Sequence, residues 1–204
     1  MKRKLLVASG NQGKVREIKK YLEDLGKNLK FEVISMNSFP QLDEVIEDGD
    51  SFRENALKKA RTRAEETGLI CLADDSGLLV ECLNGAPGVY SARYAGEGAS
   101  DADNNKKLIK ELEGFSYKNR KAYFKCVMAL IDLDEDIEIV VEGNCPGFIH
   151  LEPRGENGFG YDPLFFLEEY DKTMAELSLD EKNKISHRAR ALDKMKKEVI
   201  ERYS

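Results

Sequence analysis

The chain has 204 residues, which is enough for one sizeable domain with a proper hydrophobic core. Its apolar fraction of 41% and charged fraction of 34% are typical of a soluble globular protein. The net charge of −6 argues against a general nucleic-acid-binding protein, which usually presents a basic field, but lysines or a metal can still bind an anionic small molecule locally.

The N-terminus and the cysteines exclude two further classes. The first four residues resemble the basic start of a signal peptide, but the apolar run at residues 5–8 is too short for a signal peptide or a membrane span. We therefore expect a cytoplasmic protein. The four cysteines are far apart and the chain has two histidines, so a zinc site is not expected. Cys71, Cys82 and Cys126 lie in apolar runs and are predicted to be buried free thiols.

The first motif lies where an apolar run gives way to a helical pattern. Residues 4–8 predict a strand, and the apolar positions from Val15 to Leu25 have helical spacing, with Gly26 as a C-terminal cap. The turn between them is Ser9-Gly10-Asn11-Gln12-Gly13-Lys14. Because a helix N-terminus carries unpaired N–H groups, this turn is suited to hold phosphate; an ordinary turn with a surface lysine explains the same residues. It is neither a Walker loop nor a G-x-G-x-x-G motif.

A second strand is predicted at residues 31–35, and an acidic loop over 36–50 ends in Glu47-Asp48-Gly49. Ser51 and Glu54 form a capping-box pattern at the start of a helix that ends near Gly68. Asn55 and Lys59 are four residues apart, so they share one face at the edge of the apolar stripe. They either extend to water or line a cleft beside the core.

The strongest chemical signal follows the next predicted strand. Residues 69–73 are apolar throughout, as in a strand buried on both faces, and they lead into Asp74-Asp75-Ser76-Gly77. Adjacent carboxylates at the end of a buried strand are costly unless they are protonated, paired or bound to a cation. An Asp-rich turn before a second strand at 78–82 is the ordinary alternative.

The second half predicts a helix at 101–112, a hairpin of strands 122–132 and 137–141, and a short strand at 148–151. Arg93 either contacts phosphate or pairs with an acidic residue. The loop 154–163 is rich in glycine and aromatic residues, whose rings either stack on a nucleobase or anchor the loop to the core. Another capping pattern starts at Ser178, and residues 186–188 open the terminal helix.

Together these motifs are more specific than any one of them. They are Ser9-x-Asn11-x-x-Lys14, Glu47-Asp-Gly, Phe52-x-Glu-Asn55-Ala56-x-x-Lys59-Ala60, Ala73-Asp-Asp-Ser-Gly77-Leu78, Pro87-Gly88 with Ser91-Ala-Arg93, Phe159-Gly-Tyr-Asp-Pro163 and Ser186-His-Arg188. In this order they resemble the inosine triphosphate pyrophosphatase (ITPase) family, from about Leu5 to Leu192.

The resemblance implies an α/β fold, an elongated mixed β-sheet with flanking helices. It implies a single ITPase-like domain over residues 1–204, with two lobes around a central nucleotide cleft. The implied reaction is Mg²⁺-dependent hydrolysis of ITP, dITP and XTP to the monophosphate and pyrophosphate, which keeps deaminated purines out of nucleic acid. The implied assembly is a homodimer with a small nucleotide substrate and no nucleic-acid or membrane partner.

The resemblance also implies roles for residues that match its motifs. Glu47 and Asp75 would bind Mg²⁺, Asp75 would also be the base, and Lys59 would be catalytic; Asp74 would be a further ligand or a support. The substrate would be bound by Ser9, Gly10, Asn11, Gln12, Gly13, Lys14, Ser76, Phe159, Gly160, Tyr161, Asp162, Lys182, His187 and Arg188. Two positions depart from the family pattern: Ser9 stands where Thr is common, and Ile46 stands where some relatives have a second Glu, which favours Glu47 as the ligand.

The chemistry of these residue types is consistent with that assignment. Mg²⁺ binds through one or two carboxylates plus substrate phosphates. Attack of water at the α-phosphorus needs a metal, lysines that hold the leaving pyrophosphate and a carboxylate that orients the water, and Lys14, Lys59 and Asp75 can serve the last two needs. His187 and Arg188 are donors for the 6-keto group of the purine. A mismatched buried donor costs roughly 1–3 kcal/mol, which would exclude adenine but not guanine.

Two other functions stay open. A Maf-like pyrophosphatase would have a similar architecture but act on pyrimidine or modified nucleotides; residues 159–162 and 186–188 favour a purine. A non-catalytic nucleotide-binding protein would bind ITP without turnover, and the combination of Glu47, Lys59 and Asp75 argues against it.

Overall fold

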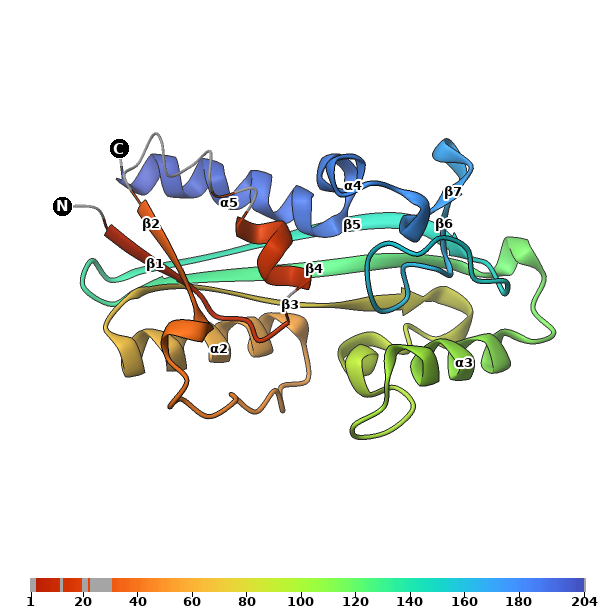
Figure 1. Ribbon diagram of the computed structural model, residues 1–204, viewed down its shortest axis with the longest axis horizontal. Coiled ribbons are helices and arrows are strands. Elements are labelled where there is room, and N and C mark those ends of the chain that lie inside the picture. The colour runs from red at the N-terminus through yellow and green to blue at the C-terminus, as the bar shows by residue number, and fades with distance from the viewer. Residues whose placement is uncertain (1–2, 12, 20–21, 23–30, 204) are drawn as a thin grey trace. The chain divides into compact units, whose positions relative to one another are not determined.

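The computed structural model describes residues 3–11, 13–19, 22 and 31–203 and is shown in Figure 1. Seven strands form one sheet in the order β2-β1-β3-β4-β5-β6-β7. The strands are β1 (Arg3–Val7), β2 (Phe31–Ser35), β3 (Ile70–Val80), β4 (Lys121–Asp132), β5 (Ile137–Ile149), β6 (Phe165–Leu167) and β7 (Lys172–Thr173). β1 pairs in parallel with β2 and β3, whereas β6 pairs antiparallel with β5 and β7. The predicted mixed α/β sheet is confirmed.

Helices flank this sheet. The long ones are α2 (Phe52–Thr67), α3 (Asp101–Leu112) and α5 (His187–Tyr203), and α4 (Leu179–Ile185) is shorter. Residues 13–19 and 22 are also helical, and we call this stretch the first helix. Across the described ranges, no helix is both long enough and apolar enough to cross a membrane.

The chain forms two compact units. The first unit comprises Met1–Asp75, Cys126–Gly143 and Arg188–Ser204, and the second comprises Ser76–Lys125 and Asn144–His187. The three strands β3, β4 and β5 each contribute residues to both units.

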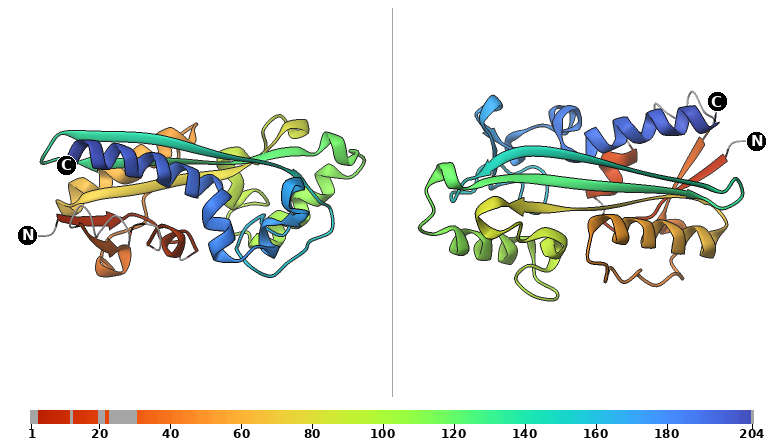
Figure 2. Two further views of the ribbon diagram at one scale, coloured as in Figure 1. Left: turned by 90° about the horizontal axis from the view of Figure 1, so that it is seen from above. Right: turned by 180° about the vertical axis from the view of Figure 1, so that it is seen from behind.

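In the first unit, helices cover both faces of the strands. Figures 1 and 2 show α2 and α5 on opposite sides. Because side chains alternate along a strand, Val7 and Leu72 pack in one cluster with residues of the first helix and α5, whereas Cys71 faces α2, where its sulfur lies 3.8 Å from Thr67 Oγ1. The helix α2 contributes a stripe of fully buried alanines to the second face: Ala56, Ala60 and Ala64.

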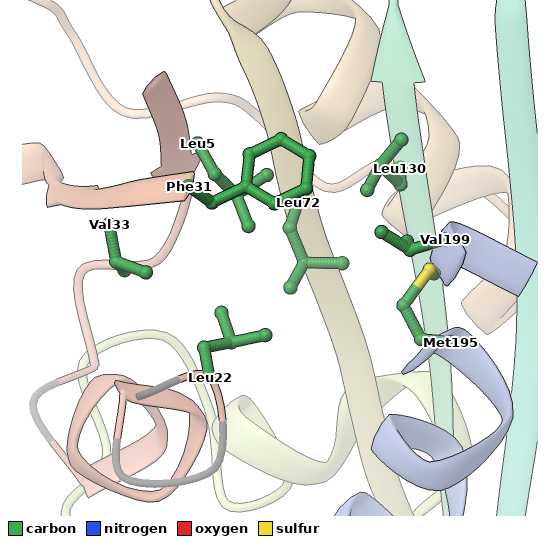
Figure 3. Close-up of a pocket in the computed structure, with 8 residues that line it drawn as sticks. All are labelled: Leu5, Leu22, Phe31, Val33, Leu72, Leu130, Met195 and Val199. Carbon is green, nitrogen blue, oxygen red and sulfur yellow. The ribbon is translucent and has the colours of Figure 1, made fainter. Parts of the chain in front are cut away.

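The core on the α5 side contains a small apolar cavity, shown in Figure 3. Its volume is about 10 Å³, and it is lined by Leu5, Leu22, Phe31, Val33, Leu72, Leu130, Met195 and Val199. This volume can hold about one water molecule, but such a lining gives water no hydrogen-bond partner. We therefore interpret the cavity as imperfect packing and not as a nucleotide site.

The second unit has its own apolar core. In α3, Leu108 and Leu112 are four residues apart and fully buried, and they belong to one cluster with Leu78, Phe124 and Phe165. The Ser100 side chain caps α3 in a reciprocal capping box with Asp103. The helix predicted at 101–112 is thereby confirmed with its predicted ends.

Two predicted breaks between strands are wrong. Residues 74–77 were predicted to leave the strand, but β3 runs without interruption from Ile70 to Val80. Asp and Ser favour turns because their side chains hydrogen-bond the nearby backbone, and Gly favours them because it adopts positive φ. Here Asp74 and Asp75 have protein partners, described below, so the backbone stays extended. The predicted strands 137–141 and 148–151 likewise merge into β5, which ends at Ile149.

Smaller expectations have mixed outcomes. The cysteines are free, and Cys71 and Cys126 are buried as predicted. Cys82 is half-buried instead, because it lies in the short 3₁₀ turn Glu81–Leu83 and not in a strand. The positions Leu25 and Gly26 lie outside the described residues.

Candidate active site

The first motif forms the turn between β1 and the first helix. Asn11 caps this helix, since its Oδ1 accepts a hydrogen bond from the Lys14 N–H at 3.1 Å. The Ser9 Oγ accepts from the Asn11 N–H at 3.3 Å. A Cβ added to Gly10 would meet no atom within 4 Å, so a ligand can approach the backbone there. Gly13 is helical, and Gln12 lies outside the described residues.

The consecutive residues Asp74 and Asp75 face opposite sides of the sheet, because side chains alternate along β3. Both carboxylates are buried, with exposed fractions of 1% and 6%. Asp74 lies on the side of the first helix and α5, and Asp75 lies on the side of α2, as their partners show. The two acids therefore have different electrostatic environments although they are neighbours in sequence.

Asp74 is surrounded by cations. Its Oδ2 lies 3.1 Å from Lys14 Nζ and 3.5 Å from Arg188 Nη2. Arg188 is itself fully buried and also donates to the carboxylate of Glu17 in the first helix. Burial opposes ionisation of Asp74, but the charges of Lys14, Arg188 and Lys59 outweigh it and hold its pKa well below the usual range. The ionised form of Asp74 is thus favoured, and its carboxylate ties Lys14 to the strand.

Asp75 has a different balance. Its Oδ2 accepts a hydrogen bond from Asn55 Nδ2 in α2 at 3.1 Å. Burial is the largest influence and the negative charge of Glu47 adds to it, so that the pKa of Asp75 rises to about 6 despite Lys59 and Lys14. The surroundings therefore favour the ionised form of Asp74 but disfavour that of Asp75.

The helix α2 also positions the acidic segment before it. Lys59 Nζ donates to Glu47 Oε1 at 2.9 Å and to the Asp74 carbonyl at 2.5 Å. Burial alone would lower the pKa of Lys59, but the negative charges of Asp74, Glu47 and Asp75 raise it, so it stays protonated. Asn55 Oδ1 accepts from the Gly49 N–H at 2.8 Å, which fixes the end of the segment to the same helix.

The predicted capping box at the start of α2 is half formed. Ser51 Oγ accepts from the Glu54 N–H at 3.2 Å, as predicted. The Glu54 carboxylate accepts from the Asp50 N–H at 2.8 Å, so its bond goes one residue earlier than the motif requires. The difference gives the acidic segment a second attachment to α2.

Glu47 and Asp75 form a donor set that fits Mg²⁺. No group of three or more Asp, Glu, His or Cys side chains suited to a metal occurs in the parts of the chain that the structure describes. Mg²⁺ does not require one, because it commonly binds one or two carboxylates and takes its other ligands from water and substrate phosphates. The mutual repulsion of Glu47 and Asp75, which contributes to the raised pKa of Asp75, is what a bound cation would relieve.

A second cluster of predicted residues lies in the second unit, on the loop 154–163. Asp162 Oδ2 accepts from the Phe159 N–H at 2.9 Å and from Lys182 Nζ at 2.6 Å. The Lys182 ammonium lies 4.7 Å from the centre of the Phe159 ring. The side chains of Lys182 and Asp162 are each 4% exposed. The loop and Lys182 of α4 therefore form an ordered structure that presents an aromatic ring, a fixed cation and backbone groups.

Other predicted residues in the second unit are fixed by neighbouring rings and carbonyls. The Tyr161 hydroxyl donates to the Ser91 carbonyl at 2.8 Å, which anchors this ring to the core. His187 is 5% exposed, and its ring stacks on Phe124 with centres 4.8 Å apart. Ser76 lies in β3 and is partly exposed.

The structure thus brings the predicted residues together in two groups, one in each unit. Ser9, Lys14, Glu47, Lys59, Asp75 and Arg188 belong to the first unit, and Ser76, Phe159, Gly160, Tyr161, Asp162, Lys182 and His187 belong to the second. Arg93, for which two roles were open, lies 3.5 Å from Glu97 and over the Tyr90 ring, which is the acidic pairing.

Two contributors were not assigned from sequence. Glu17 is 4% exposed and pairs with Arg188. At 100° per residue Glu17 lies well away from the apolar stripe of Val15, Ile18 and Leu22, so the helical pattern gave no signal for its burial. Asn55, whose side chain joins Gly49 to Asp75, was noted for its spacing to Lys59 but given no role.

Comparison with known proteins extends over nearly the whole chain. Residues 5–198 match the Ham1 family. The chain is 48% identical over 200 residues to a protein from Bacillus anthracis named dITP/XTP pyrophosphatase, covering 98% of this chain and 97% of that one.

Solved structures agree. A HAM1 protein from Coxiella burnetii is 42% identical with a TM-score of 0.87, covering 98% of this chain and 99% of that one. The Ham1 protein of Staphylococcus aureus is 39% identical with a TM-score of 0.85, covering 98% and 100% respectively. Match length, identity and fold lead to one conclusion: this chain belongs to the Ham1 family.

Proposed function

We propose that this protein hydrolyses dITP, XTP and ITP to the nucleoside monophosphate and pyrophosphate, and so removes deaminated purines from the nucleotide pool. The observation that carries the proposal is the convergence of Lys14, Lys59 and Glu47 on the consecutive β3 residues Asp74 and Asp75. The names of the relatives, which are dITP/XTP pyrophosphatases, support the same class of hydrolase.

The chemistry follows from the positions of these groups. A water oxygen attacks the α-phosphorus, the bond from that phosphorus to the bridging oxygen breaks, and pyrophosphate leaves with the electron pair. The Asp75 carboxylate, fixed by Asn55, orients this water and accepts its proton. Lys14 and Lys59 are held in place by the carboxylates of Asp74 and Glu47, and they stabilise the negative charge that develops on the leaving pyrophosphate.

Mg²⁺ would be held by Glu47 and Asp75. When bound, it neutralises charge on the phosphates and polarises the reacting phosphoryl group. Lys59 donates to Glu47 in the structure, and this bond keeps the Glu47 carboxylate on the α2 side of β3.

Base recognition is assigned to the second unit. A purine ring can stack on Phe159, while backbone groups of residues 159–162 and the donors Lys182 and His187 read its edge. Arg188, predicted as a further base donor, has carboxylate partners in Glu17 and Asp74. We predict that Arg188→Ala reduces the efficiency on ITP far more than on ATP, and equal losses on the two nucleotides would exclude Arg188 from base recognition.

The deciding experiment is phosphorus NMR of the purified protein with Mg²⁺ and dITP, ITP, XTP, GTP, ATP and dTTP in parallel. We expect monophosphate and pyrophosphate from the first three, with ATP nearly intact. Release of single phosphate would move the attack to the γ-phosphorus. Preference for dTTP would favour a Maf-like enzyme, and tight binding without turnover would favour a nucleotide-binding protein.

We further propose that the active form is a cytoplasmic homodimer. Sedimentation velocity of the purified protein tests the assembly, and fractionation of cells that express the tagged chain tests the location. A monomer that retains full activity would contradict the first expectation.

A further inference from the structure

The helix α3 contacts the loop 154–163 through two side chains that no part of the proposed function uses. The Gly160 N–H donates to Asp101 Oδ2 at 2.6 Å. The Gly160 carbonyl accepts from Asn105 Nδ2 at 2.9 Å. Asp101 and Asn105 are four residues apart and thus lie on the same face of α3. Both polar backbone groups of one loop residue are therefore bound by one helix.

Gly160 is the residue at which this contact matters most. Its φ is +61°, a left-handed conformation that residues other than glycine rarely adopt. It directly follows Phe159, and the carboxylate of Asp162 closes the loop by accepting from the Phe159 N–H. A rotation of the backbone at Gly160 would therefore turn the Phe159 ring away from Lys182.

The Asn105 side chain has little else to hold it. Its Oδ1 is buried and accepts no hydrogen bond from any described residue. The amide orientation is thus set by the Gly160 carbonyl. A buried acceptor without a donor is costly, and an asparagine that served helix stability alone would not need to be placed there.

We propose that Asp101 and Asn105 are positioning residues that hold the Gly160 backbone so that Phe159 and Asp162 are preset to receive the purine. This inference rests on the proposed function of the loop as the base-binding element. A loop that is fixed before binding loses less conformational entropy when the nucleotide binds, so the pair acts on affinity and leaves the chemical step unchanged.

The test compares Asp101→Ala and Asn105→Ala with two controls. Asp101→Asn removes the charge but keeps an oxygen that can accept from the Gly160 N–H. Lys106→Ala removes an exposed charge from the same helix. We expect each of the first two variants to raise KM for dITP about tenfold, which corresponds to about 1.4 kcal/mol, with kcat within about twofold of the parent. Asp101→Asn should recover most of the loss, and Lys106→Ala should match the parent.

A second readout does not depend on activity. Hydrogen exchange at the Gly160 amide, without nucleotide, should become faster in Asp101→Ala and stay slow in Lys106→Ala. Faster exchange with unchanged KM, or a fall in kcat at constant KM, would overturn the positioning role alone. A parent protein that neither binds nor hydrolyses any purine triphosphate would instead overturn the proposed function, and the positioning role with it.

Discussion

At the scale of single residues, the site depends on two adjacent acids with opposite environments. Asp75 is held by one amide and repelled by Glu47. We predict that Asp75→Asn lowers kcat by at least about 10²-fold, because a positioned base contributes about 10²–10⁴-fold. Stability should be kept or raised, since the variant removes a buried, partly uncompensated charge. Rates measured by pyrophosphate release, together with urea unfolding, test both parts. A fall in stability parallel to the loss of rate would argue against a catalytic role.

Asp74→Asn should have the opposite effect on stability and destabilise the protein. Asp74 is fully buried and is the anion facing both Lys14 and Arg188. Removal of one member of a buried ion cluster typically costs about 3–5 kcal/mol, because the remaining charges lose their compensation. We therefore expect urea unfolding at clearly lower concentration than for Asp75→Asn. Equal unfolding midpoints for the two variants would contradict the division of roles.

Residue types and their order predicted most of the candidate site, but not the pairings within it. That Asp74 and Asp75 are candidates for the chemistry followed from two carboxylates beside an apolar run. The charge of Asp74 is balanced by Lys14 and Arg188, and Arg188 also pairs with Glu17. Arg188 is far from the other residues in sequence and meets them only in the fold. No local pattern encodes such a contact, and this is why Glu17 received no role.

At the scale of elements, α2 holds the acidic segment through its first two turns. A Cβ on Gly49 would lie 2.8 Å from Asn55 Oδ1 and 2.8 Å from Glu54 Cβ. We predict that Gly49→Ala displaces the segment and raises the Mg²⁺ concentration needed for half-maximal activity several-fold, because Glu47 moves away from Asp75. A Mg²⁺ titration of the initial rate measures this.

Lys58→Ala is the matched control for that titration. It breaks the ion pair of Lys58 with Asp48 in the same segment, in which the two side chains are 41% and 66% exposed. Exposed pairs contribute little, so its Mg²⁺ dependence should equal that of the parent. If Gly49→Ala also equals the parent, the segment is not a metal-binding element.

Helices and strand cores were the elements best predicted from sequence, because their periodicity is local. The helix at 101–112 and the strand at 31–35 have the predicted ends. The continuity of β3 through residues 74–77 could not be predicted, since turn-forming residues stay extended here through partners supplied by the first helix, α2 and α5. Tertiary contacts outweighed the local preference of the backbone.

At the scale of the whole molecule, the described residues form two apolar cores, and three strands contribute to both. A separate fold for either unit would leave β3, β4 and β5 each cut in two. We therefore predict that the cores unfold together, as the expected single domain over residues 1–204 requires. Met128 and Leu108, each with 0% exposure, represent the first and the second core.

Met128→Ala and Leu108→Ala should each lower stability by about 2–5 kcal/mol through the cavity that they leave. If the cores are one cooperative unit, both variants shift the same single transition, and circular dichroism and tyrosine fluorescence give coincident curves. Tyrosine is the suitable probe because the chain has 8 tyrosines and no tryptophan. A variant that splits the curve into two steps, with one step at the parent's midpoint, would show that the units fold independently. Each unit would then order its own part of β3, β4 and β5, and residues 1–204 would have to be described as two domains.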